Sequence, residues 1–96
     1  MGMQYDVLAT HLTGDGTVYA GPTRVKAYAV ASGGTAGDVI FYDTAANSAS
    51  GTVRLQFQIT TNQAINSLLI PGEGIRFTNG VYVDMPANAS VTVFYG

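Results

Sequence analysis

The segment from Gly51 to Thr60 reads GTVRLQFQIT, and every second position in it is apolar. The apolar positions are Val53, Leu55, Phe57 and Ile59. Successive side chains of a β-strand point to opposite faces, so this period of two predicts a strand with one apolar and one polar face. An apolar strand face must be covered by another layer, so the segment constrains the chain to a layered β fold.

Similar short segments recur along the whole chain and are separated by glycine, proline and small polar residues. No window holds a helical apolar period between helix caps, so we expect no substantial helix. About eight or nine short strands at a spacing of about ten residues indicate an all-β chain, an antiparallel two-sheet β-sandwich of jelly-roll-like type. The expected strand segments are 5–12, 17–20, 24–31, 38–44, 51–60, 67–70, 75–78, 81–85 and 90–95.

The patterns of two of these segments predict what packs against them. The segment 38–44 has apolar side chains on both faces, which is typical of a central strand or of one covered by a partner. In the segment 24–31 one face consists of small residues, against which we expect something bulky to pack. These small residues are Val25, Ala27, Ala29 and Ala31.

Asn79-Gly80 is the firmest local signal in the chain. It stands between two apolar segments, 75–78 and 81–85. A type I′ turn needs positive φ at both of its central residues, which asparagine and glycine tolerate best. The sequence therefore predicts a β-hairpin closed at this dipeptide. By contrast, residues 44–50 are small, show no period and are expected to form a loop.

The inward positions of the expected strands define one shared core. The chain has 96 residues, which predicts a single domain over residues 1–96. At this size only about 60 to 70% of the unfolded surface can be buried, so self-association is expected to help. Residues 1–13 are either a strand of the core or an arm used in assembly. The predicted core residues are Val25, Val39, Phe41, Val53, Leu55, Phe57, Ile59, Leu69, Ile75, Phe77, Val81, Val83, Val91 and Val93.

Charge is scarce in this chain. Charged residues make up 10% of it and the formal net charge is -2, whereas soluble domains usually carry about 25%. Small and neutral polar groups are easily desolvated, which favours a protein covered by other proteins, although secreted β domains can have similar compositions. The basic residues Arg24, Lys26, Arg54 and Arg76 are scattered in the sequence. No apolar run reaches the length of a membrane span, and no export signal is visible. We therefore expect no nucleic-acid partner and no membrane partner.

No constellation of residues predicts catalysis. The chain has no cysteine, and its one histidine, His11, is expected to be structural or exposed in a strand. The sequence at 14–16, GDG, lacks the ligand spacing of a calcium loop, and the glycines at 33–37 lack a phosphate-binding pattern. We predict no enzyme, no catalytic, cofactor-binding or metal-binding residues and no cofactor. The acidic residues are too dispersed for a recognisable pair, although a sandwich can bring two loops together: Asp6, Asp15, Asp38, Asp43, Glu73 and Asp84.

Tyrosine side chains offer the main alternative to a purely structural role. Exposed rings can stack on sugars or nucleic-acid bases. Without tryptophan and with few cations, we expect these rings to cover strand faces and interfaces instead. The candidates are Tyr19, Tyr28, Tyr42, Tyr82 and Tyr95.

Four stretches together resemble small, single-domain virion structural proteins of tailed bacteriophages, particularly marine ones. The resemblance covers the chain from Gly16 to Gly96. Its most specific parts are VYAGPTRVK, PGEGIRF and VTVFYG, and the group generally lacks an assigned activity. The four stretches are TVYAGPTRVKAYAV, GGTAGDVIFYDT, PGEGIRFTNGVYVDM and SVTVFYG.

The resemblance implies a non-enzymatic virion component, most simply a capsid decoration (cement) protein on the outside of the head, or an appendage subunit. It supplies no functional residues. With the neutral surface, it predicts a symmetric homo-oligomer, with a trimer favoured, bound to the major capsid protein or another virion protein. The expected location is the virion, assembled in the host cytoplasm. The alternative is a receptor- or glycan-binding module of a head fibre or tail appendage, which needs exposed aromatic residues near 44–50 or 61–66.

Overall fold

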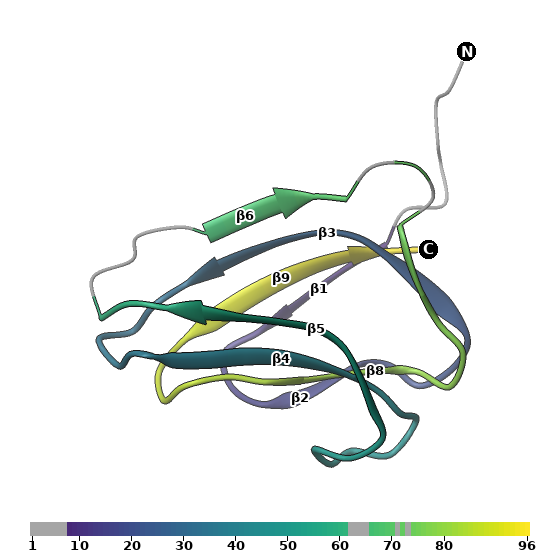
Figure 1. Ribbon diagram of the computed structural model, residues 1–96, viewed down its shortest axis with the longest axis horizontal. Coiled ribbons are helices and arrows are strands. Elements are labelled where there is room, and N and C mark those ends of the chain that lie inside the picture. The colour runs from purple at the N-terminus through teal and green to yellow at the C-terminus, as the bar shows by residue number, and fades with distance from the viewer. Residues whose placement is uncertain (1–7, 62–65, 71, 73) are drawn as a thin grey trace.

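The computed structural model describes residues 8–61, 66–70, 72 and 74–96, and these residues form nine strands and no helix. The strands lie in two facing antiparallel sheets, which confirms the predicted all-β sandwich (Figure 1). The strands are β1 (Leu8–Leu12), β2 (Gly16–Tyr19), β3 (Thr23–Ala31), β4 (Gly37–Asp43), β5 (Thr52–Ile59), β6 (Asn66–Leu69), β7 (Ile75–Phe77), β8 (Val81–Asp84) and β9 (Ser90–Tyr95).

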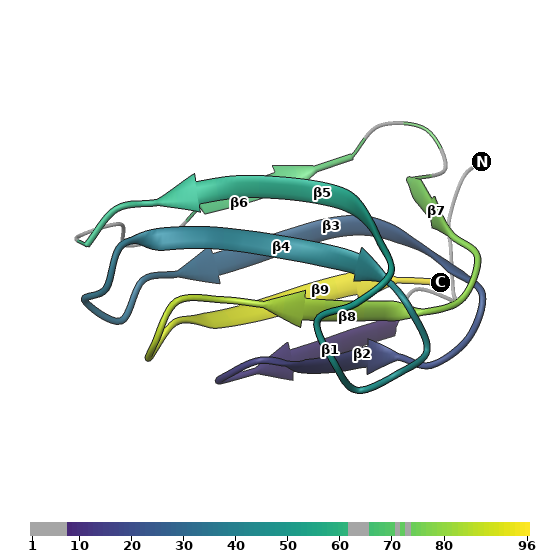
Figure 2. The same cartoon turned by 60° about the horizontal axis from the view of Figure 1, so that its bottom comes forward.

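In both sheets the strands are not in sequence order, because strands far apart in the chain pair with each other. The first sheet has the order β1-β9-β3-β6, and β7 also pairs with β3; the second has the order β2-β8-β4-β5. Strands β1 and β2 lie beside each other along one side of the sandwich, and β5 and β6 bound the opposite side (Figure 2). β4 lies between β8 and β5, as its apolar residues on both faces predicted.

The core lies between the two sheets. Tyr28 of β3 bridges them by stacking on Phe57 of β5, with ring centroids 4.6 Å apart and ring planes at 9°. Leu55 and Phe57 are half-buried at the edge of this core. Most predicted core positions are confirmed, and the side chain of Leu69 lies outside the described part. The fully buried ones are Val25, Val39, Phe41, Phe77, Val81, Val83, Val91 and Val93.

A β-bulge at Arg54 breaks the regular alternation of β5. In the pairing with β4, Leu55 lies opposite Phe41 but Val53 lies opposite Tyr42, so Arg54 is the extra residue. A bulge of one residue reverses the two faces of the strand beyond it. Val53 is therefore 44% exposed on the outer face, and its predicted place in the core is wrong.

A second bulge, at Lys26, reverses the faces of β3 in the same way. Val25 points inward before the bulge, but the next inward residues are Tyr28 and Val30. The predicted small face with a bulky element packed against it is therefore wrong, because the alternation does not continue through the bulge. The residues displaced to the half-buried outer face are Ala27, Ala29 and Ala31.

The predicted hairpin at Asn79-Gly80 is wrong. β7 pairs with β3 in the first sheet, whereas β8 pairs with β2 and β4 in the second, so this turn crosses between sheets. Its backbone groups bond to a side chain: Asn79 N donates to Asp43 Oδ1 at 2.8 Å and Thr78 N donates to Asp43 Oδ2 at 3.1 Å. A local turn preference does not determine which sheet each flanking strand joins.

The N-terminal segment contributes a strand to its own fold. β1 pairs antiparallel with β9, with Leu8 opposite Tyr95 and Leu12 opposite Val91. The part of the predicted arm from residue 8 onward is therefore a strand of the first sheet. Residues 1–7 lie outside the described residues.

Candidate functional site

His11 lies on the exposed outer face of β1. Its Nδ1 atom is 2.9 Å from Thr92 Oγ1 on the neighbouring strand β9. Within the described part of the chain, no group of three or more His, Cys, Asp or Glu residues is placed to hold a metal ion. Two of the acidic candidates, Asp6 and Glu73, lie outside that part. His11 therefore forms a polar cross-strand pair on a sheet surface.

Two carboxyl groups that are distant in the sequence come together at one end of the second sheet. Asp15 lies in the turn after β1, and Asp84 ends β8. Burial and the neighbouring charge of Asp15 raise the pKa of Asp84. Asp15 Oδ1 also accepts a hydrogen bond of 2.7 Å from Met85 N. The sequence did not reveal this pair, because it depends on the pairing of β2 with β8.

Asp43 is the buried acidic side chain of the described residues, and it organises the crossing turn. Burial alone would raise its pKa, but hydrogen bonds from the backbone of Asn79 and Thr78, from Arg54 and from the Thr78 hydroxyl outweigh burial. They lower the pKa of Asp43 to about 2. Its side chain is 1% exposed, against 39% for Arg54. The carboxylate therefore stays ionised at neutral pH and serves as a structural anchor.

The tyrosines near the loop 44–50 do not form an exposed platform. Tyr42 of β4 and Tyr82 of β8 lie opposite each other, with ring centroids 6.5 Å apart. Tyr82 is only 8% exposed and Tyr42 is half-buried. The nearby loop is tied to the sheet because Thr17 Oγ1 donates to Asn47 Oδ1 at 3.1 Å. Stacking on a sugar needs an open ring face, which this pair offers only in part.

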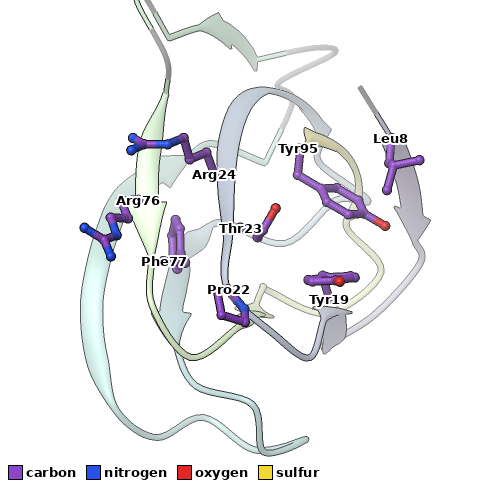
Figure 3. A pocket seen from close by; sticks show the side chains of 9 residues that line it. Leu8, Tyr19, Pro22, Thr23, Arg24, Arg76, Phe77 and Tyr95 are labelled. Atoms are coloured by element: carbon purple, nitrogen blue, oxygen red, sulfur yellow. The ribbon is translucent and has the colours of Figure 1, made fainter. Parts of the chain in front are cut away.

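A shallow hollow of about 410 Å³ lies at the end of the sandwich near the chain's C-terminus (Figure 3). Tyr19, which is 42% exposed, lies with its ring centroid 5.5 Å from that of Tyr95. Figure 3 shows Tyr19, Tyr95 and Leu8 on one side of β3, and the guanidinium groups of Arg24 and Arg76 on the other. The arginines are directed away from the rings. The hollow thus has an aromatic and apolar side near Tyr19 and Tyr95, and Arg24 and Arg76 line its other side.

Basic residues gather at this end of the first sheet, although they are scattered in the sequence. Arg24 of β3 lies directly opposite Arg76 of β7, and Lys26 follows in the bulge of β3. Side chains opposite each other on neighbouring strands have Cβ atoms about 5 Å apart, so the two arginine side chains begin side by side on one face. The fold therefore brings these three near one end of the first sheet. Arg54, the fourth, bonds to Asp43 instead.

The side of the sandwich bounded by β5 and β6 exposes apolar groups that belong to the inward faces. Leu68 of β6 shares its face with the buried Tyr28, yet it is 45% exposed. Leu55 and Phe57, on the inward face of β5, are half-buried. A second hollow, of about 640 Å³, adjoins the end of β5 and has uncharged lining residues: Ala36, Gly37, Gln58, Ile59, Thr60 and Thr61. We call this side the open side of the sandwich.

Comparisons of the chain with protein-family models, with curated proteins and with solved structures found no match. Among the residues that the structure describes, no helix is long and apolar enough to cross a membrane. The function of the chain must therefore be inferred from its own residues and surfaces.

Proposed function

We propose that this protein is a non-enzymatic structural protein of a bacteriophage virion. Its most specific form is a capsid decoration (cement) protein that binds the outside of the head as a symmetric homo-oligomer. The observation that carries the proposal is a small β-sandwich whose broad faces and open side are poor in charge. The resemblance of the sequence to small phage virion proteins supports the same role.

The outer face of the first sheet is suited to coverage by a protein partner. Its central residues are small or uncharged, and the larger apolar side chain of Phe94 is exposed among them. Desolvating such a surface costs little, because few charged groups lose their hydration. The residues of this face include Ala27, Ala29, Ala31, Thr92 and Phe94.

The outer faces carry few charged side chains, and those on the second sheet include Asp38 and Asp84. Arg54 and Asp43 bond to each other, and Arg24, Lys26 and Arg76 gather at one end of the first sheet. Because charged side chains are few, a shell protein can cover most of either face while desolvating few charged groups. The trimer favoured from the sequence remains a prediction.

Binding to phage heads tests the proposal. Purified protein is mixed with heads that lack it, and the heads are sedimented and imaged by cryo-electron microscopy. We expect saturable binding and density for the β-sandwich on the outer surface. Phe94→Lys should weaken binding if the outer face of the first sheet contacts the shell, while Ala87→Lys, a change at an exposed loop residue, serves as the control. Heads and tails without this density would contradict the proposal.

One surface of the protein favours the alternative function, a receptor- or glycan-binding module. The hollow beside Tyr19 has an exposed aromatic ring, whereas the Tyr42 and Tyr82 pair is mostly covered. A glycan array with the wild-type protein and with Tyr19→Ala tests this alternative. Hits that disappear in Tyr19→Ala would favour it over decoration, and an array without hits would remove it.

A further inference from the structure

β5 is an edge strand of the second sheet that could pair with a further strand. Among the described residues only β4 pairs with it, so one side of its backbone faces outward along Thr52–Ile59. Edge strands expose unpaired N–H and C=O groups, and proteins usually protect them with lysine, proline, inward charges or β-bulges. β5 contains neither lysine nor proline, and its charged residue Arg54 donates to Asp43. The bulge at Arg54 disturbs one end and leaves the stretch 55–59 regular.

We propose that β5 is a self-association edge, at which two copies of this chain pair antiparallel about a two-fold axis and join their second sheets into one. This inference rests on the proposed function for its biological setting, and it assigns the decoration protein a two-fold contact in place of the trimer that the sequence favoured. The occupant of the edge is a second copy of the chain.

The residues of β5 are complementary to themselves in this pairing. A two-fold axis at Gln56 places Leu55 opposite Phe57 of the second copy, on the inward face. Gln56 then meets its own equivalent on the outer face, where two amide side chains can bond to each other. No like charges oppose each other, because Arg54 lies opposite Gln58. Between residues 55 and 57, apolar side chains thus meet on the inward face and polar ones meet on the outer face. The pairs beyond them include the bulge, and there Val53 of one copy and Ile59 of the other lie on opposite faces.

The open side provides the apolar contact that a strand pair alone lacks. Leu68, Leu55 and Phe57 are exposed or half-buried there and would become covered in the dimer. A strand of this length measures about 27 Å, and two stacked sheets with their side chains are about 20 Å thick. A contact along the full length of the strand, bulge included, would bury about 1,100 Å² in total, which is at the lower limit of about 1,000 Å² expected of a specific interface.

The edge on the opposite side is less suitable. β1 and β2 lie beside each other there, so the space between the sheets is closed on that side. β1 also carries the exposed His11, which bonds to Thr92. Self-association is therefore assigned to β5 rather than to β1.

Sedimentation velocity and light scattering on the full chain test the proposal, together with two charge variants. We expect a concentration-dependent dimer of about twice the 10.0 kDa chain mass. Gln56→Lys and Gln56→Glu each place like charges across the axis and should raise the dimer dissociation constant roughly fivefold or more. Mixing the two variants should restore a dimer. Ala9→Lys, an equivalent change on the exposed face of the β1 edge strand, should leave dimerisation unchanged.

Hydrogen exchange on the wild-type protein gives a second measurement that does not depend on a variant folding. Amides within Thr52–Ile59 should gain protection as the protein concentration rises through the dimerisation range. A strict monomer, a trimer, or a dimer insensitive to Gln56→Lys and without this protection would overturn the proposal. A trimer would leave the decoration role intact, whereas a β5 dimer that does not bind heads would contradict only that role. If the edge pairs with another virion protein instead, wild-type chains stay monomeric and β5 gains protection only on particles.

Discussion

Arg54 and Asp43 form a two-pronged contact in which Nε and Nη2 of the guanidinium both donate to Oδ2, at 3.1 and 3.0 Å. The same carboxylate accepts hydrogen bonds from the turn between β7 and β8, including Asn79 N and Gly80 N at its Oδ1. One side chain therefore joins the bulge of β5, the end of β4 and the crossing between the sheets. A buried charge is tolerated here because every bond it lost from water is replaced by a protein donor.

Replacement of Asp43 should strongly destabilise the fold. In Asp43→Ala the turn loses its acceptors and Arg54 loses its partner, and we expect a loss of about 3 kcal/mol in the free energy of unfolding. Urea unfolding followed by circular dichroism measures this. Asp38→Asn is the matched control, because Asp38 accepts a bond from the exposed Gln56 and should change stability by less than about 0.5 kcal/mol. An equal effect of both variants would show that Asp43 is not the anchor.

Acid should remove the contribution of Asp43 to the free energy of unfolding, in a defined pH range. Its pKa is about 2 in the folded protein against a usual 3.8, so the unfolded chain takes up the proton first as pH falls. The stabilisation, about 2 kcal/mol, is present above pH 3.8 and is lost as pH falls toward about 2. Unfolding measured between pH 5 and about 2 should show the stability gap between wild type and Asp43→Asn narrowing over this range. A constant gap would contradict this linkage.

Asp84→Asn should stabilise the protein at neutral pH. Burial and Asp15 raise the pKa of Asp84, so the folded state favours its protonated form. Stability therefore falls as pH rises through this raised pKa, and the neutral amide removes that cost. We expect a gain of up to about 1 kcal/mol at pH 7, measured by thermal unfolding, and no gain below the usual pKa of aspartate.

A double-mutant comparison tests whether Asp15 causes the loss of stability that accompanies ionisation of Asp84. Asp15→Asn keeps an oxygen that can accept from Met85 N and also removes the charge. Combining it with Asp84→Asn should add little, because each change alone relieves the same repulsion. Fully additive gains would show that the two carboxyl groups act independently.

Gly33→Ala should disrupt the packing of two loops. A Cβ atom at Gly33 would collide with the backbone carbonyl of Asn88, in the loop between β8 and β9. Because backbone must move to relieve the overlap, we expect a loss of about 2 kcal/mol or more in thermal or urea unfolding. Gly14→Ala is the control, since a Cβ there has no atom within 4 Å. Equal stability of Gly33→Ala and Gly14→Ala would contradict the close approach.

Strand positions follow from local properties of the chain, and the sequence determined them well. Alternation and turn residues act over a few neighbours, so each expected strand segment overlaps a strand of the structure. The central place of β4 was also readable, because a strand covered on both faces needs apolar residues on both. The sandwich architecture follows from these strands and from the absence of helical patterns among the described residues.

Where the alternation breaks, and which distant groups meet, depends on contacts between strands that are far apart in the sequence. The bulge at Arg54 belongs to the pairing of β5 with β4, and the Arg54 guanidinium bonds to Asp43 there. Nothing local in GTVRLQFQIT marks this position. Asn79-Gly80 suits a tight turn, but the carboxylate of Asp43 holds it as a crossing between sheets. Contacts between residues far apart in the chain stabilise the bulge and the crossing turn, and they outweigh local preferences here. Such contacts cannot be predicted from a single segment.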